Sequence, residues 1–458
     1  MRGAARSAAI MALLFCAAAL LSACSDVDRQ QAKICVAVAT AVAPENQKVS
    51  IQSVIPLVGV SHAVRVNYSV PGMALPLYVD CAFGGGMLEP GRGDVIGVRG
   101  YDGALSEREL LTLYRWFLSR DDFIDRAVAE TNWQPASIQL LSWAPPKAVG
   151  FALQQVTNIL NLAALYSPLA LAFALIYGLI RRINMAFGQI TVIGGYGAIF
   201  GIVAAVGIPS FGPFATLALA VACAVSLAAL WGWLVGRTVV LPLADRPDRA
   251  FMIATIGLGI ALSEMLRLGQ GAREIWVEPM LDTPVILTAG AFPVVVPEMR
   301  LVIILVALIV LPAVLAFMRL SRFGRAWLSV ADDPVMARLA GINTGAVTAV
   351  TLILASALAA GGGLVLALSY GTISFSMGLM VGLKALLASL VGGAGSLLGA
   401  VLGGLLIATL ETAWSAYFDS TSRDIVVLGV LTLLFLLRPN GLMGLGKALE
   451  EGRGTRLS

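Results

Sequence analysis

Charged side chains are scarce in this sequence, and histidine is nearly absent. Asp, Glu, Lys and Arg make up only 13% of the 458 residues, about half the share of roughly 25% in soluble proteins. His62 is the single histidine, so the sequence offers no cluster of metal ligands. The motif G-x-x-x-x-G-K-[ST], which cradles nucleotide phosphates, is also missing. We therefore expect neither a metal nor ATP to be bound by this chain.

Long apolar runs are what the sequence has instead. Its residues are 58% hydrophobic and its mean hydropathy is +0.87. The runs recur from about residue 151 onwards, each near the ~20 residues that a helix needs to cross a bilayer. The prediction is a multi-span α-helical membrane protein with about 8–10 transmembrane helices. The candidate spans are 156–180, 184–207, 213–235, 251–268, 301–318, 348–369, 380–392, 397–417 and 425–437.

The first 24 residues have the pattern of a signal peptide. Arg2 and Arg6 precede an apolar run that continues through Leu21. The run ends in Leu21-Ser22-Ala23-Cys24, which resembles the lipobox of bacterial lipoproteins and implies lipidation of Cys24. An uncleaved signal anchor and an ordinary signal peptidase site are the alternatives. In each case the segment that follows should face outward.

Residues 25–147 have the polarity of a soluble domain. Two strand-like runs, VSIQSVIPLVGV and VRVNYSV, precede a helical pattern that Ser106 and Glu109 open as a capping box. We expect a small N-terminal extracytoplasmic α+β domain. Cys35 and Cys81 would share its oxidising compartment and can pair there, although sequence alone does not give their separation. A prolyl hinge at 143–146 then leads into a transmembrane domain at 148–446 and a cytoplasmic tail at 447–458.

The distribution of basic residues predicts the direction of the spans. Short cytoplasmic loops collect Lys and Arg, and an exported residue 150 followed by nine crossings leaves the C-terminus inside. On this scheme the outer connections hold only Arg273, Arg300, Lys384 and Arg423. The inner side holds Arg181, Arg182, Arg237, Arg246, Arg249, Arg319, Arg322, Arg325, Arg338, Arg438, Lys447, Arg453 and Arg456. The predicted location is a bacterial inner membrane.

The longest inner loop, residues 323–343, has an amphipathic pattern. Ala331-Asp332-Asp333-Pro334 reads as a helix start, because Asp can cap and proline is tolerated at the first helical position. Apolar residues then recur at helical spacing up to Gly341, which ends the turn. The loop is either an interfacial anchor that contacts lipid headgroups or a docking element for another protein.

Several stretches together resemble one transporter family. They are LIYGLIRRINMAFGQITVIGGYGA, MIATIGLGIAL, GRAWLSVADDPVMARLAGIN, YGTISFSMGLMVGLKALLASLVGGAGSLLGAVLGGLL and LFLLRPNGLMG. Over residues 152–444 the chain is similar to permease subunits of branched-chain amino acid (Liv type) ABC importers. In that family the inner loop resembles the coupling helix that docks on an ATPase subunit. The resemblance thus implies ATPase coupling by Ala331, Asp332, Asp333, Pro334, Ala337, Arg338 and Gly341.

The same resemblance implies partners and a class of cargo. It implies ABC ATPase subunits that hold ATP and Mg, a second permease subunit, identical or different, and a periplasmic substrate-binding protein. The lipid bilayer is the surrounding partner, nucleic acid is not expected, and the chain is a transport permease rather than an enzyme. Branched-chain or related small amino acids are the expected cargo. The alternatives are a urea or amide permease, a membrane-anchored ligand-binding receptor and an ion-driven secondary transporter.

Polar residues within apolar spans are the candidates for the translocation path, because lipid penalises them. Where this chain has Phe187 and Gln189, members of the family usually carry a histidine and a glutamate, so a proton-linked role there is not expected. Gly395, Gly399 and Gly403 form a G-x-x-x-G-x-x-x-G row for close helix packing. The candidate path residues are Asn184, Gln189, Thr255, Thr372, Ser374 and Lys384.

Overall fold

The structure is a computed structural model in which the chain divides into two compact units, Met1–Ser137 and Ile138–Ser458. The predicted lipidation site Cys24 and the predicted tail at 447–458 lie outside the residues that the structure describes. Those residues are 27–443 except for gaps at 44–48, 58–61, 72–76, 86–90, 120, 134–137, 140–142, 144, 207–212, 244–245, 278–280, 282–283, 289–291, 394, 439–440 and 442.

The first unit is built on an antiparallel sheet of five strands in the order β1-β2-β3-β4-β5. The sequence predicts its first two strands, but not the helix α2 that precedes them. One predicted helix appears as three pieces, α3, η1 and α4. The elements are α2 (Arg29–Val42), β1 (Ser50–Pro56), β2 (Ala63–Ser69), β3 (Leu77–Phe83), β4 (Val95–Gly100), β5 (Gly103–Ala104), α3 (Glu107–Leu113), η1 (Tyr114–Leu118) and α4 (Asp121–Glu130).

The apolar side chains of α2 and of the sheet form one core. Cys35 and Val36 of α2 are fully buried, as are Val66 and Tyr68 of β2. Burial raises the pKa of the Tyr68 phenol above its ordinary value. The core therefore explains why a segment with strand-like alternation and one amphipathic helix folds as a unit.

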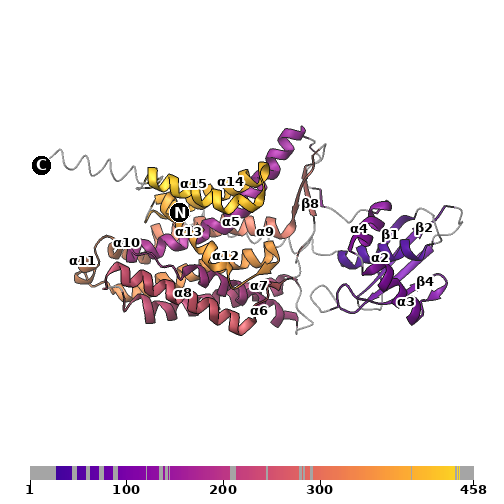
Figure 1. The fold of residues 1–458 in the computed structure, drawn as a ribbon, viewed down its shortest axis with the longest axis horizontal. Helices are drawn as coiled ribbons and strands as arrows, with labels where there is room; N and C mark the ends of the chain where they lie inside the picture. Colours follow the sequence, from indigo (N-terminus) through magenta and orange to yellow (C-terminus); the bar gives the residue numbers. More distant parts are fainter. Residues whose placement is uncertain are drawn as a thin grey trace. The chain divides into compact units, whose positions relative to one another are not determined.

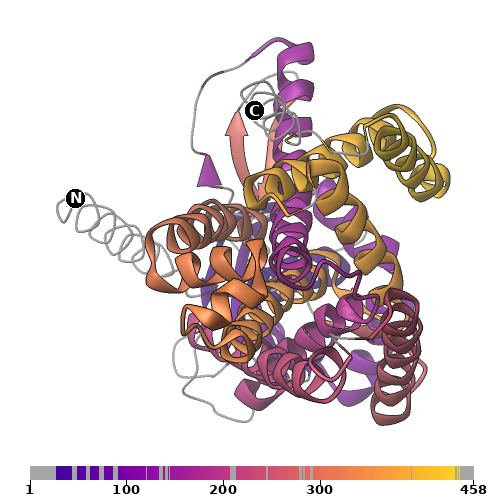
Figure 2. The same ribbon diagram turned by 90° about the vertical axis from the view of Figure 1, so that its left-hand side faces the viewer.

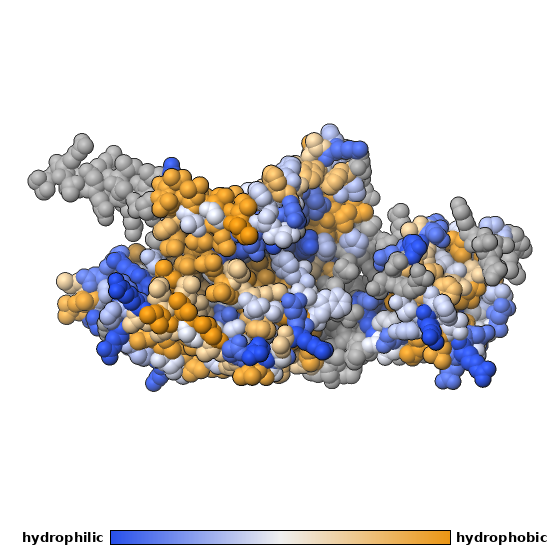
Figure 3. All heavy atoms as spheres, viewed as in Figure 1, coloured by the Kyte–Doolittle hydropathy of each residue, from blue (hydrophilic) through white to orange (hydrophobic). Residues whose placement is uncertain are grey.

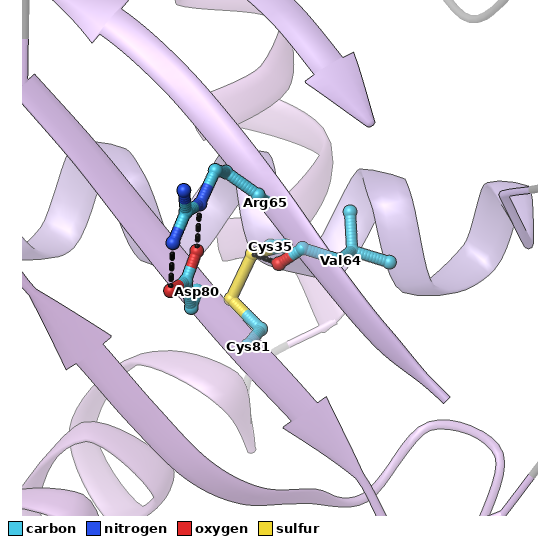
Figure 4. The surroundings of a disulfide bond; sticks show 5 residues. All are labelled: Cys35, Val64, Arg65, Asp80 and Cys81. Carbon is cyan, nitrogen blue, oxygen red and sulfur yellow. Dashed lines mark hydrogen bonds and ion pairs between the residues drawn. A yellow bond between two sulfur atoms is a disulfide. The ribbon is translucent and has the colours of Figure 1, made fainter. Parts of the chain in front are cut away.

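A disulfide joins this helix to the sheet. Cys35 of α2 and Cys81 of β3 are bonded with their Cα atoms 5.8 Å apart, and Figure 4 shows the bond crossing from the helix to the strand. On the other side of the sheet Arg65 donates two hydrogen bonds to Asp80, at 2.6 and 2.8 Å. A cross-link that closes a loop of this length contributes about 3–4 kcal/mol, mainly by restricting the unfolded chain.

Ser106 opens α3 as the sequence predicts. Its side chain accepts from the backbone N–H of Glu109, and the Glu109 carboxylate accepts from the Ser106 N–H at 2.8 Å. A further hydrogen bond from the Ser106 hydroxyl, at 2.7 Å, helps to hold the pKa of Glu109 below its ordinary value. The predicted capping box is confirmed.

The second unit is a bundle of long apolar helices (Figure 1). Among the described residues, seven helices are long and apolar enough to cross a membrane. The 17-residue α13 and the 15-residue α15 are shorter. Together they correspond to the nine predicted spans. They are α5 (Lys147–Ile180), α6 (Phe187–Val206), α7 (Pro213–Val235), α8 (Asp248–Gln270), α9 (Glu298–Leu320), α12 (Thr344–Tyr370), α13 (Met377–Gly393), α14 (Leu397–Tyr417) and α15 (Arg423–Leu437).

Short elements connect the long helices at the two ends of the bundle. The unit begins at Ile138, before the predicted boundary at 148, because β6 pairs in parallel with β8. In Figure 1, α10 and α11 lie at one end and β8 at the other, and Figure 2 views the first of these ends. The connecting elements are β6 (Ile138–Gln139), η2 (Gly236–Val240), β7 (Ile275–Trp276), β8 (Pro284–Thr288), β9 (Val294–Pro297), α10 (Arg322–Asp332), α11 (Pro334–Leu339), β10 (Thr372–Ile373) and η3 (Ser420–Ser422).

Contacts between connections test whether the spans alternate in direction. At one end, Arg181 after α5 donates to the carbonyl of Ala331 in α10 at 2.8 Å, and Arg182 pairs with Asp248 of α8 at 2.9 Å. At the other end, Thr372 after α12 pairs with Trp276 after α8. Connections predicted on the same side of the membrane thus meet one another. For α5, α8 and α12, the directions of the helices alternate as the sequence predicts.

Glycines let α13 and α14 approach closely, but one of the three predicted residues takes no part. A Cβ on Gly399 would overlap Gly392 of α13, and a Cβ on Gly403 would overlap the carbonyl of Ala388. Gly395 lies before α14, which begins at Leu397, and its φ is +82°. Gly395 therefore supplies a left-handed turn, and it lies against Gly178 of α5 rather than between α13 and α14.

Helix α5 is the longest helix and has a proline near its middle. Its 34 residues include Pro168, which has no N–H to donate to the preceding turn. Neighbouring helices make such prolines tolerable within membranes. Here Ser167 donates to the carbonyl of Val401 in α14 at 3.1 Å, and Gly404 packs directly against Ser167. The weakest point of α5 is thus supported by α14.

Candidate functional site

Two buried amide side chains lie where α6 crosses α13. The backbones touch because Gly188 of α6 faces Gly378 and Gly382 of α13, and a Cβ on Gly188 would overlap the carbonyl of Gly378. Asn184 is 2% exposed and Gln189 is 6% exposed. Among the described residues, Asn184 Nδ2 and Gln189 Oε1 have no hydrogen-bond partner. Unpaired polar atoms in a dry site are costly, so these two atoms are the candidates to bind a polar partner.

A narrow, mostly apolar crevice opens beside these amides. Asn184 is its polar side chain, and the rest of its lining is apolar or glycine: Phe173, Met185, Gly188, Leu379, Gly382, Leu383 and Leu386. The Oδ1 atom of Asn184 is already used, since it accepts from the Ala186 N–H at 3.0 Å. The Nδ2 atom of the same amide is buried and without a partner among the described residues, and the crevice beside it has a volume of only about 10 Å³.

Thr255 adjoins the same turn, as part of α8. The Met185 N–H donates to Thr255 Oγ1 at 3.4 Å, and Thr255 donates in turn to the carbonyl of Met252 at 3.0 Å. The Thr255 side chain is fully buried, and both of its hydrogen bonds are to backbone groups of the protein. Thr255 therefore holds the backbone turn that carries Asn184 and does not line open space. Phe187, at the start of α6, packs edge-on against Phe173 of α5, with the ring centroids 6.1 Å apart.

Thr372 and Ser374 lie in the short segment before α13. Thr372 pairs with Trp276 in a two-stranded sheet, and the hydroxyls of Ser374 and Ser376 are 3.1 Å apart. The next residue, Phe375, accepts a hydrogen bond from Ser263 of α8 at 3.3 Å. This segment packs on α6 beside the amides, because a Cβ on Gly378 would lie 2.5 Å from Gln189 Oε1 and a Cβ on Gly195 would overlap Ile373.

Lys384 belongs to a different place, a buried ion network. Its Nζ lies 2.5 Å from Glu411 Oε1 of α14 and 3.0 Å from Asp424 Oδ1 of α15. The Tyr166 hydroxyl of α5 donates to Glu411 at 3.0 Å, and Arg423 lies 3.3 Å from Asp424. Lys384 is 4% exposed and Glu411 is fully buried.

This network faces away from the crevice. Lys384 follows Gly382 by two residues, which is a turn of about 200° around α13, so it points to α14 and α15 while Gly382 faces α6. The contacts of Lys384 support a structural pairing of four helices and not a place in the path. Sequence alone places Lys384 among the path candidates and does not pair it with Glu411 or Asp424. The available signal was that all three lie near the same ends of neighbouring spans.

Side chains that could ligate a metal ion do not form a cluster among the described residues. Within the part of the chain that the structure describes, no three His, Cys, Asp or Glu side chains are positioned to hold a metal ion.

The inner loop forms two short helices joined at Asp333. Asp333 caps α11, since its Oδ1 accepts from the N–H groups of Val335 and Met336 at 2.8 and 3.0 Å, and Pro334 takes the first helical position. The predicted helix start is wrong for Ala331 and Asp332, which form the last turn of α10 instead. The reason is that Ser321 caps an additional helix upstream, accepting from the Gly324 N–H at 2.9 Å.

The exposed face of α11 is apolar and basic. Val335, Met336 and Leu339 are 54%, 62% and 78% exposed, with the charged Arg338 beside them. Figure 3 shows blue side chains where α10 and α11 lie, with orange ones at the tip. Ala337 is only 4% exposed, so this small side chain faces the chain itself, and its role in ATPase coupling stays a prediction.

The loop is fastened to α5. Trp327 of α10 is 5% exposed and packs so closely on Gly178 that a Cβ there would lie 2.9 Å from the indole ring. Arg181 holds the carbonyl of Ala331 from the same helix end. After α11, Gly341 adopts φ +84° and Asn343 caps α12 by accepting from Ala346 at 3.0 Å. A force on α11 is therefore passed directly to α5 and α12.

Known proteins resemble this chain over the bundle. The family model described as branched-chain amino acid transport system, permease component, matches residues 155–436. LivH of Salmonella typhimurium strain LT2, a high-affinity branched-chain amino acid transport system permease protein, is 32% identical over 295 residues, which are 64% of this chain and 96% of LivH. BraD of Pseudomonas aeruginosa has the same description and is 33% identical over 295 residues, which are 64% of this chain and 95% of BraD.

A third relative is more distant. LsrC of Klebsiella pneumoniae, an autoinducer 2 import system permease protein, is 30% identical over 197 residues, which are 40% of this chain and 54% of LsrC. No solved structure shows significant similarity to the chain. The family match begins within α5 and ends within α15, so it includes the crevice, the ion network and the inner loop. The chain therefore belongs to the family of branched-chain amino acid transport system permease components.

Proposed function

We propose that this permease component carries a branched-chain amino acid, or a related small amino acid, inward through an ABC importer. The observation that carries the proposal is the extent of the similarity, which covers 96% of LivH and 95% of BraD. The match to LsrC covers only 54% of that relative, so amino acid cargo is favoured over the autoinducer of that system.

The crevice between α6 and α13 has the chemistry for such a cargo, but its volume of about 10 Å³ requires the two helices to move apart before a cargo can enter. Its leucine, methionine and phenylalanine side chains suit an aliphatic side chain. The free N–H donors of Asn184 can bind a carboxylate, and the free Oε1 of Gln189 can accept from an ammonium group. Two neutral amides match a zwitterion without adding a buried charge, whose desolvation would be costly.

The energy for transport must come from a partner, and α11 is the proposed docking element. ATP and Mg would be held by separate ATPase subunits, in agreement with the absence of a phosphate-binding motif from the sequence. The exposed apolar face of Val335, Met336 and Leu339 suits the centre of a protein interface. The fastening of α10 to α5 gives such a partner a mechanical connection to the bundle.

Charge supports the proposed orientation in a bacterial inner membrane. The end of the bundle with α10 and α11 carries Arg181, Arg182, Arg319, Arg322 and Arg325, as the positive-inside rule requires of a cytoplasmic face. The disulfide of the first unit fits the oxidising side of that membrane. A second permease subunit and a periplasmic binding protein complete the proposed importer.

The cargo can be tested in proteoliposomes that contain the complete importer. With a panel of loaded binding proteins, we expect leucine, isoleucine or valine to stimulate ATP hydrolysis and uptake. Urea and acetamide should not do so, because they cannot engage both amides and the apolar crevice together. Stimulation by urea or acetamide alone would replace the amino acid proposal with the amide permease.

Asn184→Asp tests the crevice itself. The substitution keeps the oxygen that accepts from Ala186 but replaces the N–H donors by a charge that repels a carboxylate. Loss of a hydrogen bond to a charged group costs about 1.5–3 kcal/mol, so we expect uptake to fall at least about tenfold. The matched control is Asn158→Asp, which changes a half-buried asparagine of α5 that donates to Gln155 and does not line the crevice. Equal uptake by both variants would show that Asn184 does not touch the cargo.

The first unit is proposed to hold the loaded binding protein near the bundle. Its exposed aromatic and aliphatic side chains include Trp116 at 65% and Leu111 at 68%, and such residues often anchor protein contacts. A fold that only stabilises the complex is the alternative.

Removing residues 27–133, with the signal segment retained, should therefore weaken binding-protein association about tenfold or more. Uptake at saturating binding protein should change little, since the bundle is intact. Trp116→Ala provides a smaller change that keeps the fold, and the association constant is measured by surface plasmon resonance on nanodiscs. If neither variant alters that constant, the docking role is excluded.

A further inference from the structure

Helix α7 carries an apolar stripe on its outer surface that ends in a cation. Leu230, Trp233 and Leu234 are 57%, 40% and 37% exposed. Arg237 follows at the same helical spacing, and at about 100° per residue all four lie within about 100° of one another. The stripe points away from α12, because Gly232 and Gly236 on the other side of α7 pack directly on Ser356 and Leu352. It therefore faces the surroundings of the bundle.

A cleft of about 210 Å³ lies at the end of this stripe. It is lined by Trp233, Gly236, Arg237, Leu241, Gly345 and Ala349. Three of these residues are glycine or alanine, so the space results from missing side chains at the meeting of α7, η2 and α12. The helix also changes here from α-helical to π-helical geometry at η2, and π-helical turns are often found at functional sites.

The cleft attracts a negative charge. The guanidinium of Arg237 lies 5.9 Å from the centre of the Trp233 ring, and no carboxylate among the described residues pairs with it. Gly345 belongs to the first turn of α12, where the helix dipole is positive. Two independent sources of positive potential, a side chain and a helix end, thus point at one apolar-walled space.

The position of the cleft is the boundary between lipid and water. It lies between the last turn of α7 and the first turn of α12, two helices long enough to span a membrane. Trp and Arg are the side chains that favour this depth, and basic pockets between transmembrane helices bind lipid head groups. We propose that the cleft binds the phosphate head group of an anionic phospholipid, with an acyl chain along Leu230 and Leu234.

A second permease subunit is the competing occupant of this face. The stripe has only one charge, and that charge lies at the membrane boundary rather than at its centre, which fits a phospholipid with its phosphate above its chain. A protein partner would need a carboxylate at the same depth. The site is independent of the cargo and of the ATPase, so it extends the proposed function rather than restating it.

The test is native mass spectrometry of the full chain released from nanodiscs of phosphatidylglycerol and phosphatidylethanolamine. We expect a retained phosphatidylglycerol, whose occupancy falls about fivefold or more in Arg237→Ala and in Gly345→Leu and recovers partly in Arg237→Lys. Gly345→Leu fills the cleft without strain, because a Cβ there meets only Asn343 Oδ1 at 3.5 Å. Arg319→Ala, which removes another exposed arginine at the same end of the bundle, should leave the occupancy unchanged.

Three outcomes would overturn the proposal. The first is equal loss in Arg319→Ala, which would indicate a diffuse effect of charge. The second is displacement of the lipid by millimolar inorganic phosphate, which would indicate a site for the free ion. The third is a change in the monomer–dimer ratio with unchanged lipid occupancy, which would indicate that a second subunit covers the stripe.

Discussion

Replacing Leu339 with glutamate is expected to abolish ATP-driven transport while leaving the permease inserted and folded. Leu339 is 78% exposed on α11, so a charge there does not disturb the chain's own packing. In a docked complex it would be buried without a partner, at a cost of at least about 2 kcal/mol for a central interface residue. We therefore expect association with the ATPase subunits to weaken about thirtyfold, measured by co-purification and by ATP hydrolysis in the assembled importer.

Two matched variants control this experiment. Leu339→Met keeps an apolar side chain of similar volume and should retain transport. Leu268→Glu introduces the same charge at a residue that is 81% exposed near the opposite end of the bundle, and it should retain ATPase association. Normal association of Leu339→Glu, or equal loss in Leu268→Glu, would contradict docking through α11.

Replacing Lys384 with methionine is expected to destabilise the bundle strongly. The substitution leaves the fully buried Glu411 without its cation, although Tyr166 still donates to it. Breaking a buried pair in this way costs about 3–5 kcal/mol. We expect the temperature at which the purified protein loses its monodisperse peak to fall by about 10 °C or more.

A double-mutant cycle separates pairing from transport. Glu411→Gln in the Lys384→Met background removes the orphaned charge and should recover part of the lost stability. Asp424→Asn should have a smaller effect, because the Asp424 side chain is 44% exposed and also contacts Arg423. A Lys384→Met protein of normal stability that takes up substrate poorly would instead return Lys384 to the translocation path.

The division of the bundle into spans was predictable because each span is decided by its own residues. The apolar runs, the capping of α11 by Asp333 and the turn at Gly341 depend on contacts within a few positions along the chain. The basic residues of the short loops predict the direction of the spans, and this signal too is read from each loop alone. Such local features survive whatever the helices pack against.

The residues that form the candidate site were less predictable, because they depend on which helices pack against each other. Asn184 and Gln189 belong to the candidate site because Gly188 packs against α13. The sequence of α6 alone does not show that α13 is its neighbour. Ala337 was implied for ATPase coupling by the family resemblance, yet its side chain faces the chain itself. Gly395 has the spacing of a regular glycine row, but it lies before the start of α14, outside the helix that carries the other two glycines.

The length of α5 has a mechanical consequence. At about 1.5 Å per residue its 34 residues measure about 50 Å, so one element reaches from the arginines beside α10 to Gly150, which touches Phe292 near the hairpin of β8 and β9. The buried stretch of α5, residues 163–176, lies near the middle of the helix. A tilt of about 5° around that stretch would move the two ends by about 2 Å in opposite directions.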